Sequence, residues 1–334
     1  MNQRNKAQAV VYALGIACAL QAHPLLAQGR GSKTHIKTVF VILMENHNWT
    51  GNNAGAAFGD PDIKGNPLAP YINGPLLQAS SHAEQYFNPP GNHPSLPNYL
   101  WLEAGTNFGI LKDILPKQAH LRTDQHFVKL LENAGITWKA YAEPDFGNPD
   151  FTDCPLDFSE LDVNHLPFVY FSDITDGFRS SSPECIAHVK PYDQLAVDLA
   201  AGTVAQYNFI TPNLCHDMHE GVSPCDPSES TDNTERGDTW LSTEVLKILN
   251  SKAYQHGGAL FIIWDEAEDS GSFSDGPVGL FVLSPFAKGD GYENSIHYTH
   301  GSTLRTFQEI FGVTPLLGDA ANETDLSDLF GVFP

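Results

Sequence analysis

The stretch FVILMEN, residues 40–46, is a run of apolar side chains that ends on an acid and an amide. A second stretch, ALFIIWDE at residues 259–266, ends on two acids. Such unbroken apolar runs are typical of strands in a parallel sheet that helices cover on both faces. Because the carboxyl ends of these strands face one crevice, the sequence predicts that the two polar ends meet there.

The rest of the chain broadly alternates between strand and helix patterns. Strands are predicted over residues 38–45, 137–143, 206–211, 259–266 and 278–284, and helices over 96–104, 125–133, 193–201, 239–250 and 302–311. Several of the helices end at a glycine, which is a common helix terminus. This alternation predicts an α/β fold, a doubly wound and mostly parallel sheet flanked by helices.

The first 27 residues are typical of a secretory signal peptide. Arg4 and Lys6 precede an apolar stretch over residues 7–22, and small residues near Ala27 provide a cleavage site. This stretch is shorter than the roughly 20 residues that a membrane span needs. We therefore expect a secreted or periplasmic protein without a membrane span, whose residues 28–334 form a single domain. A lipoprotein anchored at Cys18 is the alternative.

Four of the five cysteines follow the predicted signal peptide. An even number of cysteines in an exported protein predicts two disulfides. Proximity in the sequence favours pairing Cys154 with Cys185 and Cys215 with Cys225. Zinc binding is the alternative, although the cysteines do not form the CxxC pairs of common zinc sites.

The chain is strongly acidic, with 40 Asp and Glu against 18 Lys and Arg, and its net charge is −22. Binding to the nucleic-acid backbone needs a basic surface, which is not visible in this sequence. We therefore expect no nucleic-acid partner. The charge favours a small substrate and a compensating cation in the site.

The two polar strand ends carry oxygen ligands that suit a divalent cation. Glu45 and Asn46 follow the first apolar run, while Asp265 and Glu266 close the other. Carboxylates gathered in one crevice repel each other unless a cation or protons neutralise them. These residues are therefore predicted metal ligands, and the alternative is that each pair simply begins a loop.

Ser95 lies between two prolines at the predicted start of a helix. Backbone N–H groups at a helix N-terminus bind anions, so a hydroxyl there can meet a phosphate group. A metal ion that coordinates this hydroxyl makes its alkoxide accessible. Ser95 is therefore the predicted nucleophile, whereas the alternative is that it only caps the helix.

The chain has 14 histidines, and several of them lie beside predicted strand ends or helix starts. They are His93, His216, His219, His297 and His300. Imidazole can ligate a metal, hold a phosphoryl oxygen or protonate a leaving alkoxide. A structural or surface role is the alternative for each of them.

Five motifs in this order resemble the phosphoesterase family, which includes bacterial acid phosphatases and phospholipases C within the alkaline-phosphatase-like superfamily. They are MENHN (44–48), HPSLPNY (93–99), ITPNLCHDMH (210–219), IIWDE (262–266) and HYTHGSTLRTFQEIFG (297–312). Together they extend along nearly the whole chain after the predicted signal peptide. The resemblance implies an alkaline-phosphatase-like fold and a divalent metal ion.

The resemblance also implies a role for each matching residue. The implied metal ligands are Glu45, Asn46, Ser95, Asp265 and Glu266, and Ser95 is also the implied nucleophile. His219 and His300 are the implied acid and base, and His216 and Asp217 contact the phosphoryl group. We add His93, which precedes the nucleophile, to the phosphate-binding residues.

These observations predict a metal-dependent phosphomonoesterase of the acid-phosphatase type, in which a phosphoserine forms at Ser95 and water then releases phosphate. One alternative is a phosphodiesterase or phospholipase C, which would need an apolar groove, for instance from the Phe-rich residues 146–178. A non-catalytic metal-binding scaffold is a second alternative, but it would be expected to lack the nucleophile or the ligands.

Overall fold

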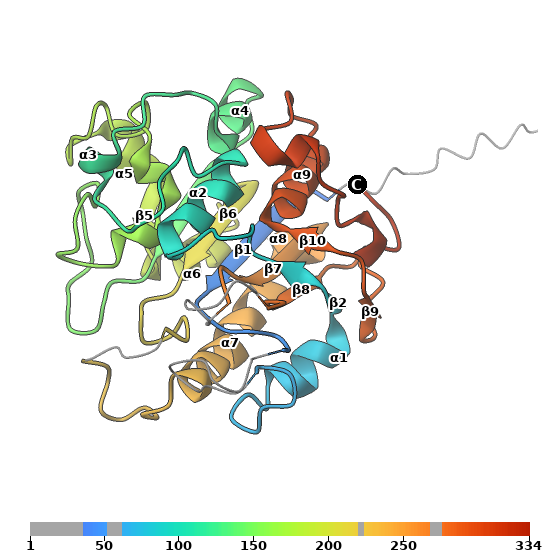
Figure 1. Cartoon of the computed structure of the whole chain (residues 1–334). Helices are drawn as coiled ribbons and strands as arrows, with labels where there is room; N and C mark the ends of the chain where they lie inside the picture. Colours follow the sequence, from blue (N-terminus) through green and yellow to red (C-terminus); the bar gives the residue numbers. More distant parts are fainter. Residues whose placement is uncertain (1–35, 52–61, 220–223, 268–275) are drawn as a thin grey trace, which may run out of the picture. The chain divides into compact units, whose positions relative to one another are not determined.

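Strand β1 (Thr38–Met44) lies between β6 (Tyr207–Thr211) and β7 (Gly258–Trp264) in the middle of an eight-stranded sheet (Figure 1). Both neighbours are parallel to β1. Every residue of β6 and β7 is buried, and so is every residue of β1 after Thr38. The unbroken apolar runs of the sequence thus form the strands that are covered on both faces, as predicted.

This computed structural model describes residues 36–51, 62–219, 224–267 and 276–334. They belong to one unit, Thr34–Pro334. The predicted signal peptide, residues 1–27, lies outside the described residues. Within the described ranges, no helix is long and apolar enough to cross a membrane.

The strands of the sheet follow the order β5-β4-β6-β1-β7-β8-β2-β9. The remaining members are β2 (Ser81–Ala83), β4 (Trp138–Ala142), β5 (Val189–Pro191), β8 (Leu280–Leu283) and β9 (Tyr292–Asn294). Only β8 runs against its neighbours, so the sheet is mostly parallel. A separate pair is formed by β3 (Tyr86–Phe87) and β10 (Tyr298–Thr299). The short strands β2, β5 and β9 were not predicted, because runs of three residues carry little periodic signal.

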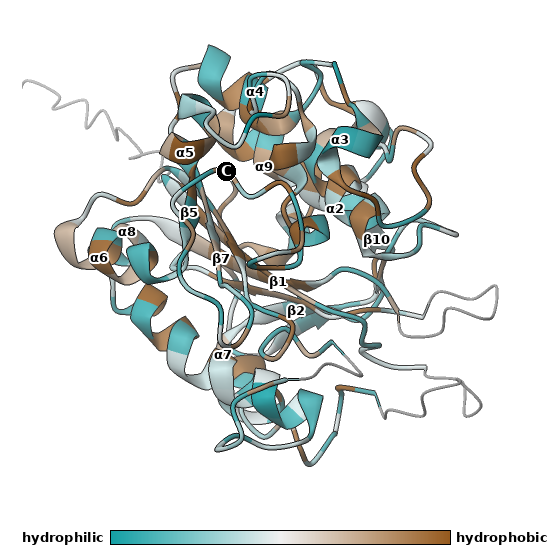
Figure 2. Cartoon of the chain, turned by 90° about the vertical axis from the view of Figure 1, so that its left-hand side faces the viewer, coloured by the Kyte–Doolittle hydropathy of each residue, from teal (hydrophilic) through white to brown (hydrophobic). Residues whose placement is uncertain are grey.

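Helices cover both faces of this sheet (Figure 2). On one face lie α2 (Ser95–Ala104), α4 (Phe127–Asn133) and α9 (His300–Phe311), which contact one another. On the other lie α6 (Asp193–Ala201), α7 (Asn233–Leu249) and α8 (Lys252–Gln255). The short helices are α1 (Leu77–Ala79), α3 (Pro116–Ala119), α5 (Pro183–His188), η1 (Ile72–Leu76), η2 (Val163–His165), η3 (Pro167–Tyr170), η4 (Gly318–Ala321) and η5 (Ser327–Leu329). The predicted α/β fold is confirmed.

Helix α7 begins six residues earlier than the sequence pattern predicted, at Asn233. The reason is its cap, because Asp232 Oδ1 accepts the backbone N–H of Glu235 at 3.0 Å. A carboxylate at this position satisfies a helix N–H that has no partner within the helix. The apolar face of α7 starts later, which is why the pattern missed the first turn.

Two disulfides cross-link segments that lie outside the strands of the sheet. Cys154 is bonded to Cys185 and Cys215 to Cys225, with Cα atoms 5.5 and 5.7 Å apart. Both predicted pairings are therefore confirmed. The second bridge closes a loop that begins just after β6 and carries His216 and Asp217.

Candidate active site

Strands β1 and β7 end side by side, and their last residues Met44 and Trp264 are paired. The residues that follow, Glu45 and Asp265, are both fully buried at this edge of the sheet. The backbone N–H of Asn46 donates to Asp265 Oδ1 at 3.2 Å. Asn46 has a φ of 48°, in the left-handed region that Asn tolerates better than most residues. The structure thus brings the two polar strand ends together.

Ser95, the predicted nucleophile, is the first residue of α2 and lies against Glu45. Its Oγ donates to Glu45 Oε2 at 2.9 Å. One turn later, the hydroxyl of Tyr99 donates to Glu45 Oε1 at 2.5 Å. Residues four apart lie on the same face of a helix, so both hydroxyls reach one carboxylate. Helix α2 therefore holds the predicted nucleophile directly against a predicted metal ligand.

Glu266, the second acid after β7, is contacted by the same part of the chain. Asn98 Nδ2 donates to Glu266 Oε2 at 2.9 Å. His93 Nδ1 lies 2.8 Å from the same oxygen. Since His93 and Asn98 flank Ser95 in the sequence, the start of α2 is tied to both strand ends.

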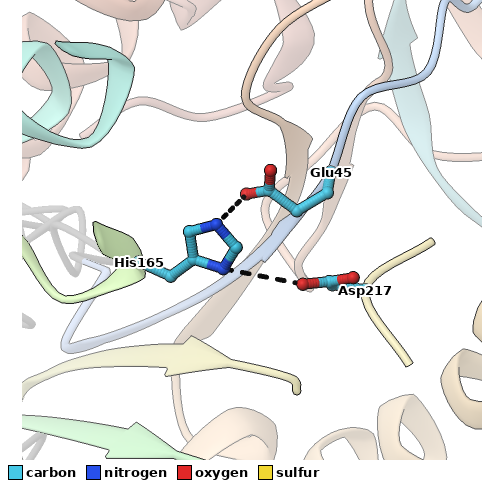
Figure 3. Close-up of side chains that lie close together, drawn as sticks. All are labelled: Glu45, His165 and Asp217. Carbon is cyan, nitrogen blue, oxygen red and sulfur yellow. Dashed lines mark ion pairs between the residues drawn. The ribbon is translucent and has the colours of Figure 1, made fainter. Parts of the chain in front are cut away.

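The loop after β6 contributes Asp217, which lies beside a histidine that the sequence analysis missed (Figure 3). The carbonyl oxygen of Asp217 accepts the backbone N–H of Glu45 at 2.8 Å. His165 lies between the two acids, with Nε2 3.4 Å from Glu45 Oε1 and Nδ1 3.6 Å from Asp217 Oδ2. Its ring stacks on Tyr99 at a centroid distance of 4.9 Å. No motif or strand end marks His165, because it comes from η2 in the long excursion after β4.

The electrostatics of this cluster are dominated by burial and by repulsion between carboxylates. Burial is the largest cause that raises the pKa of Glu45, Asp217 and Asp265 well above the usual value. Neighbouring acids add to it, since Asp265 and Asp217 raise the pKa of Glu45 and Glu266 raises that of Asp265. Burial lowers the pKa of His165 to about 4, so this ring is neutral near pH 7.

The residues of the cluster fit a divalent cation. Two buried oxygens, Asp217 Oδ2 and Asp265 Oδ2, have no hydrogen-bond partner among the described residues. Such a carboxylate is costly unless a charge or a donor compensates it. Glu45, His165 and Asp217 each offer a ligand atom within 4.8 Å of the others. Carboxylate oxygens suit magnesium, calcium or manganese, and a mixed set with imidazole suits zinc, so the donors do not select one metal.

Two of the predicted histidines are engaged by other protein groups. Both ring nitrogens of His300 are taken, one by the hydroxyl of Tyr86 at 2.8 Å and one by the carbonyl oxygen of Asp265 at 2.5 Å. Burial lowers the pKa of His300 to about 4. This neutral ring therefore contacts the backbone of a predicted metal ligand.

His216 lies next to Asp217 in the sequence, but its ring is held by carboxylates outside the cluster. Its Nδ1 is 2.9 Å from Glu143 Oε2 and its Nε2 is 3.1 Å from Glu229 Oε1. Burial lowers the pKa of His216, but Glu143 and Glu229 outweigh it and raise the pKa above its usual value. Both ring nitrogens of His216 are therefore engaged by carboxylates outside the cluster.

His219 lies closer to the cluster. Its backbone N–H donates to Asp217 Oδ1 at 2.8 Å. The preceding Met218 has a φ of 80°, which is strained for a side chain of this size. The strained turn thus holds the backbone of His219 against the carboxylate of Asp217.

Helix α7 supports this turn through Gly237. A Cβ atom at Gly237 would lie 2.3 Å from Met218 Cγ and 3.1 Å from the carbonyl oxygen of His216. Met218 is fully buried beneath the helix. Glycine at this helical position therefore permits the close approach that holds the turn in place.

The Phosphoesterase family model matches residues 72–314 of the chain. This chain belongs to the phosphoesterase family. The match covers most of the described residues and includes four of the five motifs, all except MENHN at residues 44–48. The phosphoesterase is thus a hydrolase that acts on phosphate esters.

Known proteins agree with this assignment. The phosphoesterase is 28% identical over 269 residues to a phosphatidylinositol-3-phosphatase of Mycobacterium tuberculosis, covering 80% of this chain and 78% of the relative. It is 25% identical over 234 residues to an acid phosphatase of Aspergillus fumigatus, covering 68% of this chain but 47% of that relative. The chain therefore spans about half the length of the fungal enzyme.

A solved protein of the alkaline phosphatase superfamily from Vibrio parahaemolyticus has the same fold, with a TM-score of 0.56. At 12% identity, the alignment covers 88% of this phosphoesterase and 72% of the other chain. This likeness confirms the alkaline-phosphatase-like fold that the motifs implied.

Proposed function

We propose that this phosphoesterase is an exported, metal-dependent phosphomonoesterase of the acid-phosphatase type, with Ser95 as the nucleophile. The observation that carries the proposal is the 2.9 Å hydrogen bond from Ser95 Oγ to Glu45 Oε2 inside a buried cluster of carboxylates. A hydroxyl at a helix N-terminus and beside acidic ligands is suited to attack a phosphoryl group.

In the proposed reaction, Glu45, Asn46, Asp265 and Glu266 would hold a divalent cation beside Ser95. Such a cation would supply positive charge that stabilises the alkoxide and the phosphoryl oxygens. The proton of Ser95 Oγ has a path along the hydrogen bond to Glu45 Oε2. The new Oγ–P bond forms as the bond from phosphorus to the leaving oxygen breaks.

We assign the acid that protonates the leaving oxygen to His219. His165 is neutral because burial lowers its pKa to about 4, and it is better suited to position Glu45 and Asp217. His300 serves to orient Asp265 through its backbone carbonyl. Water then attacks the phosphoserine as the Oγ–P bond breaks. The deprotonated His219 takes one proton of the water, and Ser95 Oγ regains its proton from Glu45, so that phosphate and free Ser95 result.

The names of the relatives favour a monoester substrate. One relative is named for the phosphate monoester of an inositol lipid and the other is an acid phosphatase. A phosphoinositide is therefore a second candidate substrate beside small phosphate monoesters. The two disulfides support the proposal that the protein is exported, since disulfides persist in oxidising compartments.

A diesterase remains the rival proposal. It is favoured by two exposed aromatic side chains in the long excursion, Phe146 at 41% and Phe158 at 50% exposure. An apolar leaving group could contact such side chains. Three of the six phenylalanines of the excursion, Phe151, Phe168 and Phe171, are buried in the core, however, and this weakens the argument.

The test is hydrolysis of p-nitrophenyl phosphate, bis-p-nitrophenyl phosphate and p-nitrophenylphosphorylcholine by the mature protein, with and without chelator. We expect chelator-sensitive turnover of the monoester that is lost in Ser95→Ala and retained in Ser242→Ala, a control on the exposed face of α7. Faster turnover of a diester would support the rival. If metal-loaded protein is inert on all three, the proposal is wrong and a non-catalytic scaffold is the better interpretation.

A further inference from the structure

A second group of metal-ligating side chains lies at the end of the sheet opposite to Glu45. It surrounds Trp138, the first residue of β4, whereas the proposed active site follows the last residues of the parallel strands. The side chains of Glu132, Glu184 and His188 each offer one ligand atom, and these atoms lie within 4.8 Å of one another. The proposed reaction does not use these three residues.

The three side chains come from two helices that contact β4. Glu184 and His188 lie four residues apart on α5, so they share one face of this helix, and His188 Nε2 is 3.1 Å from Glu184 Oε1. Glu132 comes from the last turn of α4. Helix α5 is also held by the disulfide from Cys185 to Cys154. The group therefore links elements whose positions the fold already fixes.

The buried residue Trp138 orients two of the three side chains. Its carbonyl oxygen lies 2.8 Å from His188 Nδ1, and its indole N–H donates to Glu132 Oε1 at 3.1 Å. The rings of Trp138 and His188 also stack at a centroid distance of 4.4 Å. Because a carbonyl oxygen only accepts, Nδ1 carries a proton and Nε2 is the nitrogen that faces Glu184. Histidines that bind metals are typically fixed in this way, with the other ring N–H on a carbonyl or carboxylate.

The charges around His188 Nε2 are mostly negative. In a neutral ring this nitrogen has a lone pair, which a carboxylate repels, so a proton or a cation must lie between them. Among the described residues, Glu184 forms no ion pair with Lys or Arg. Lys129 compensates Glu132 only in part, because its Nζ lies 3.0 Å from Glu132 Oε2 and 3.5 Å from Asp173 Oδ2.

We propose that Glu132, Glu184 and His188 form a structural metal site that binds a zinc ion. One imidazole nitrogen and two carboxylates are a donor set that suits zinc, and a water molecule completes the usual four ligands. The ion ties α4 to α5 over the first residue of β4. This inference goes beyond the proposed function and does not depend on it, since the two sites lie at opposite ends of the sheet.

The simpler alternative is that a protonated His188 forms an ion pair with Glu184. Pairs at this helical spacing are common on protein surfaces and contribute little to stability. The two alternatives make different predictions for zinc. An ion pair needs no metal, so removing either partner leaves zinc binding unchanged, whereas a metal site loses its ion when a ligand is removed.

The experiment is equilibrium dialysis of the full mature protein against zinc at neutral pH, with the bound zinc counted by elemental analysis. We expect the wild type to bind one zinc ion more than His188→Asn, whose amide can still donate to the carbonyl oxygen of Trp138. Glu184→Gln, at an exposed position, should bind this ion about tenfold more weakly or worse. The matched control is His256→Asn, an exposed histidine at the end of α8, which should bind as much zinc as the wild type.

The inference is overturned if either His188→Asn or Glu184→Gln binds as much zinc, and as tightly, as the wild type. It is also overturned if His256→Asn loses the same ion, because surface histidines in general would then account for the binding. Turnover of p-nitrophenyl phosphate should be equal in the wild type and in all three variants. If the wild type hydrolyses none of the phosphate esters, the proposed function is wrong, but the count of zinc ions still decides this inference.

Discussion

Ser95 and Glu45 are joined by a hydrogen bond of 2.9 Å, although they lie 50 positions apart in the chain. The bond connects the first residue of α2 to the residue after β1. Glu45 is fully buried and also accepts the hydroxyl of Tyr99. The orientation of this one carboxylate thus determines where the proposed nucleophile and the proposed cation lie relative to each other.

Replacing Tyr99 with Phe should weaken the site without unfolding the protein. The variant loses the hydroxyl that orients Glu45 Oε1 but keeps the ring that stacks on His165. Mutating a residue that hydrogen-bonds a metal ligand typically lowers metal affinity or activity by about 10- to 100-fold. Metal titration and kcat/KM for p-nitrophenyl phosphate measure the loss. Tyr254→Phe, in α8, is the control, and an equal loss in both variants would contradict a role for Tyr99 in orienting Glu45.

Mutating His165 should lower catalytic efficiency much more than mutating His216. Because His165 contacts the carboxylates of Glu45 and Asp217, we expect His165→Asn to lower kcat/KM by about tenfold or more. His216 is bound to Glu143 and Glu229, so His216→Asn should lower kcat/KM by no more than about threefold. Steady-state kinetics on a monoester tests both. The reverse order would favour the phosphate-binding role that the sequence motifs imply for His216.

Removing the metal should destabilise the protein more at pH 7 than at pH 5. Burial and mutual repulsion raise the pKa of Glu45, Asp217 and Asp265 in the folded, metal-free chain. Between the unfolded pKa of about 4 and the raised folded values, the folded state binds more protons. The stability of the metal-free protein therefore falls as pH rises through this window, and a bound cation offsets the loss. Scanning calorimetry of metal-loaded and dialysed protein measures the difference in Tm, and equal differences at both pH values would be evidence against a metal in this cluster.

A buried ion network away from the site should control stability but not catalysis. His126 lies 3.1 Å from Glu103 Oε1 and 3.2 Å from Asp173 Oδ1, and its side chain is fully buried. Burial lowers the pKa of His126, but the two acids outweigh it and raise the pKa to about 9. Removing one partner of a buried ion pair costs about 3 to 5 kcal/mol. We expect His126→Asn to lose stability on this scale in urea unfolding, with unchanged turnover per folded molecule.

The pH dependence of this network has a definite sign. Because the folded pKa of His126 is above the unfolded value of about 6.5, its stabilising effect is complete below that value. It is lost as pH rises through about 9. The difference in unfolding free energy between the wild type and His126→Asn should therefore narrow above pH 9. The control is His256→Asn, at an exposed position, and its unfolding free energy should equal that of the wild type. A gap that does not change with pH would mean that packing, rather than charge, accounts for the loss.

The main strands and helices, and the polar ends of two central strands, could be predicted from the sequence alone. Unbroken apolar runs identify β1 and β7 and predict that their polar ends meet in one crevice. The structure adds that the two strands are parallel neighbours, which places Glu45 beside Asp265. The disulfides were also predictable, because an even number of cysteines in a chain with a predicted signal peptide pairs most simply by proximity. These features depend on local pattern, which a single sequence contains.

Which histidines contact the carboxylates depends on the tertiary fold. His165 comes from an irregular excursion whose path depends on packing, and no periodicity marks it. His216 and Asp217 are neighbours in the sequence, yet the turn at Met218 sends one to Glu143 and the other to the cluster. Asp113 reaches Leu96 in the same way, from a loop without regular structure. Side-chain direction in loops is set by long-range contacts, and local sequence does not encode those contacts.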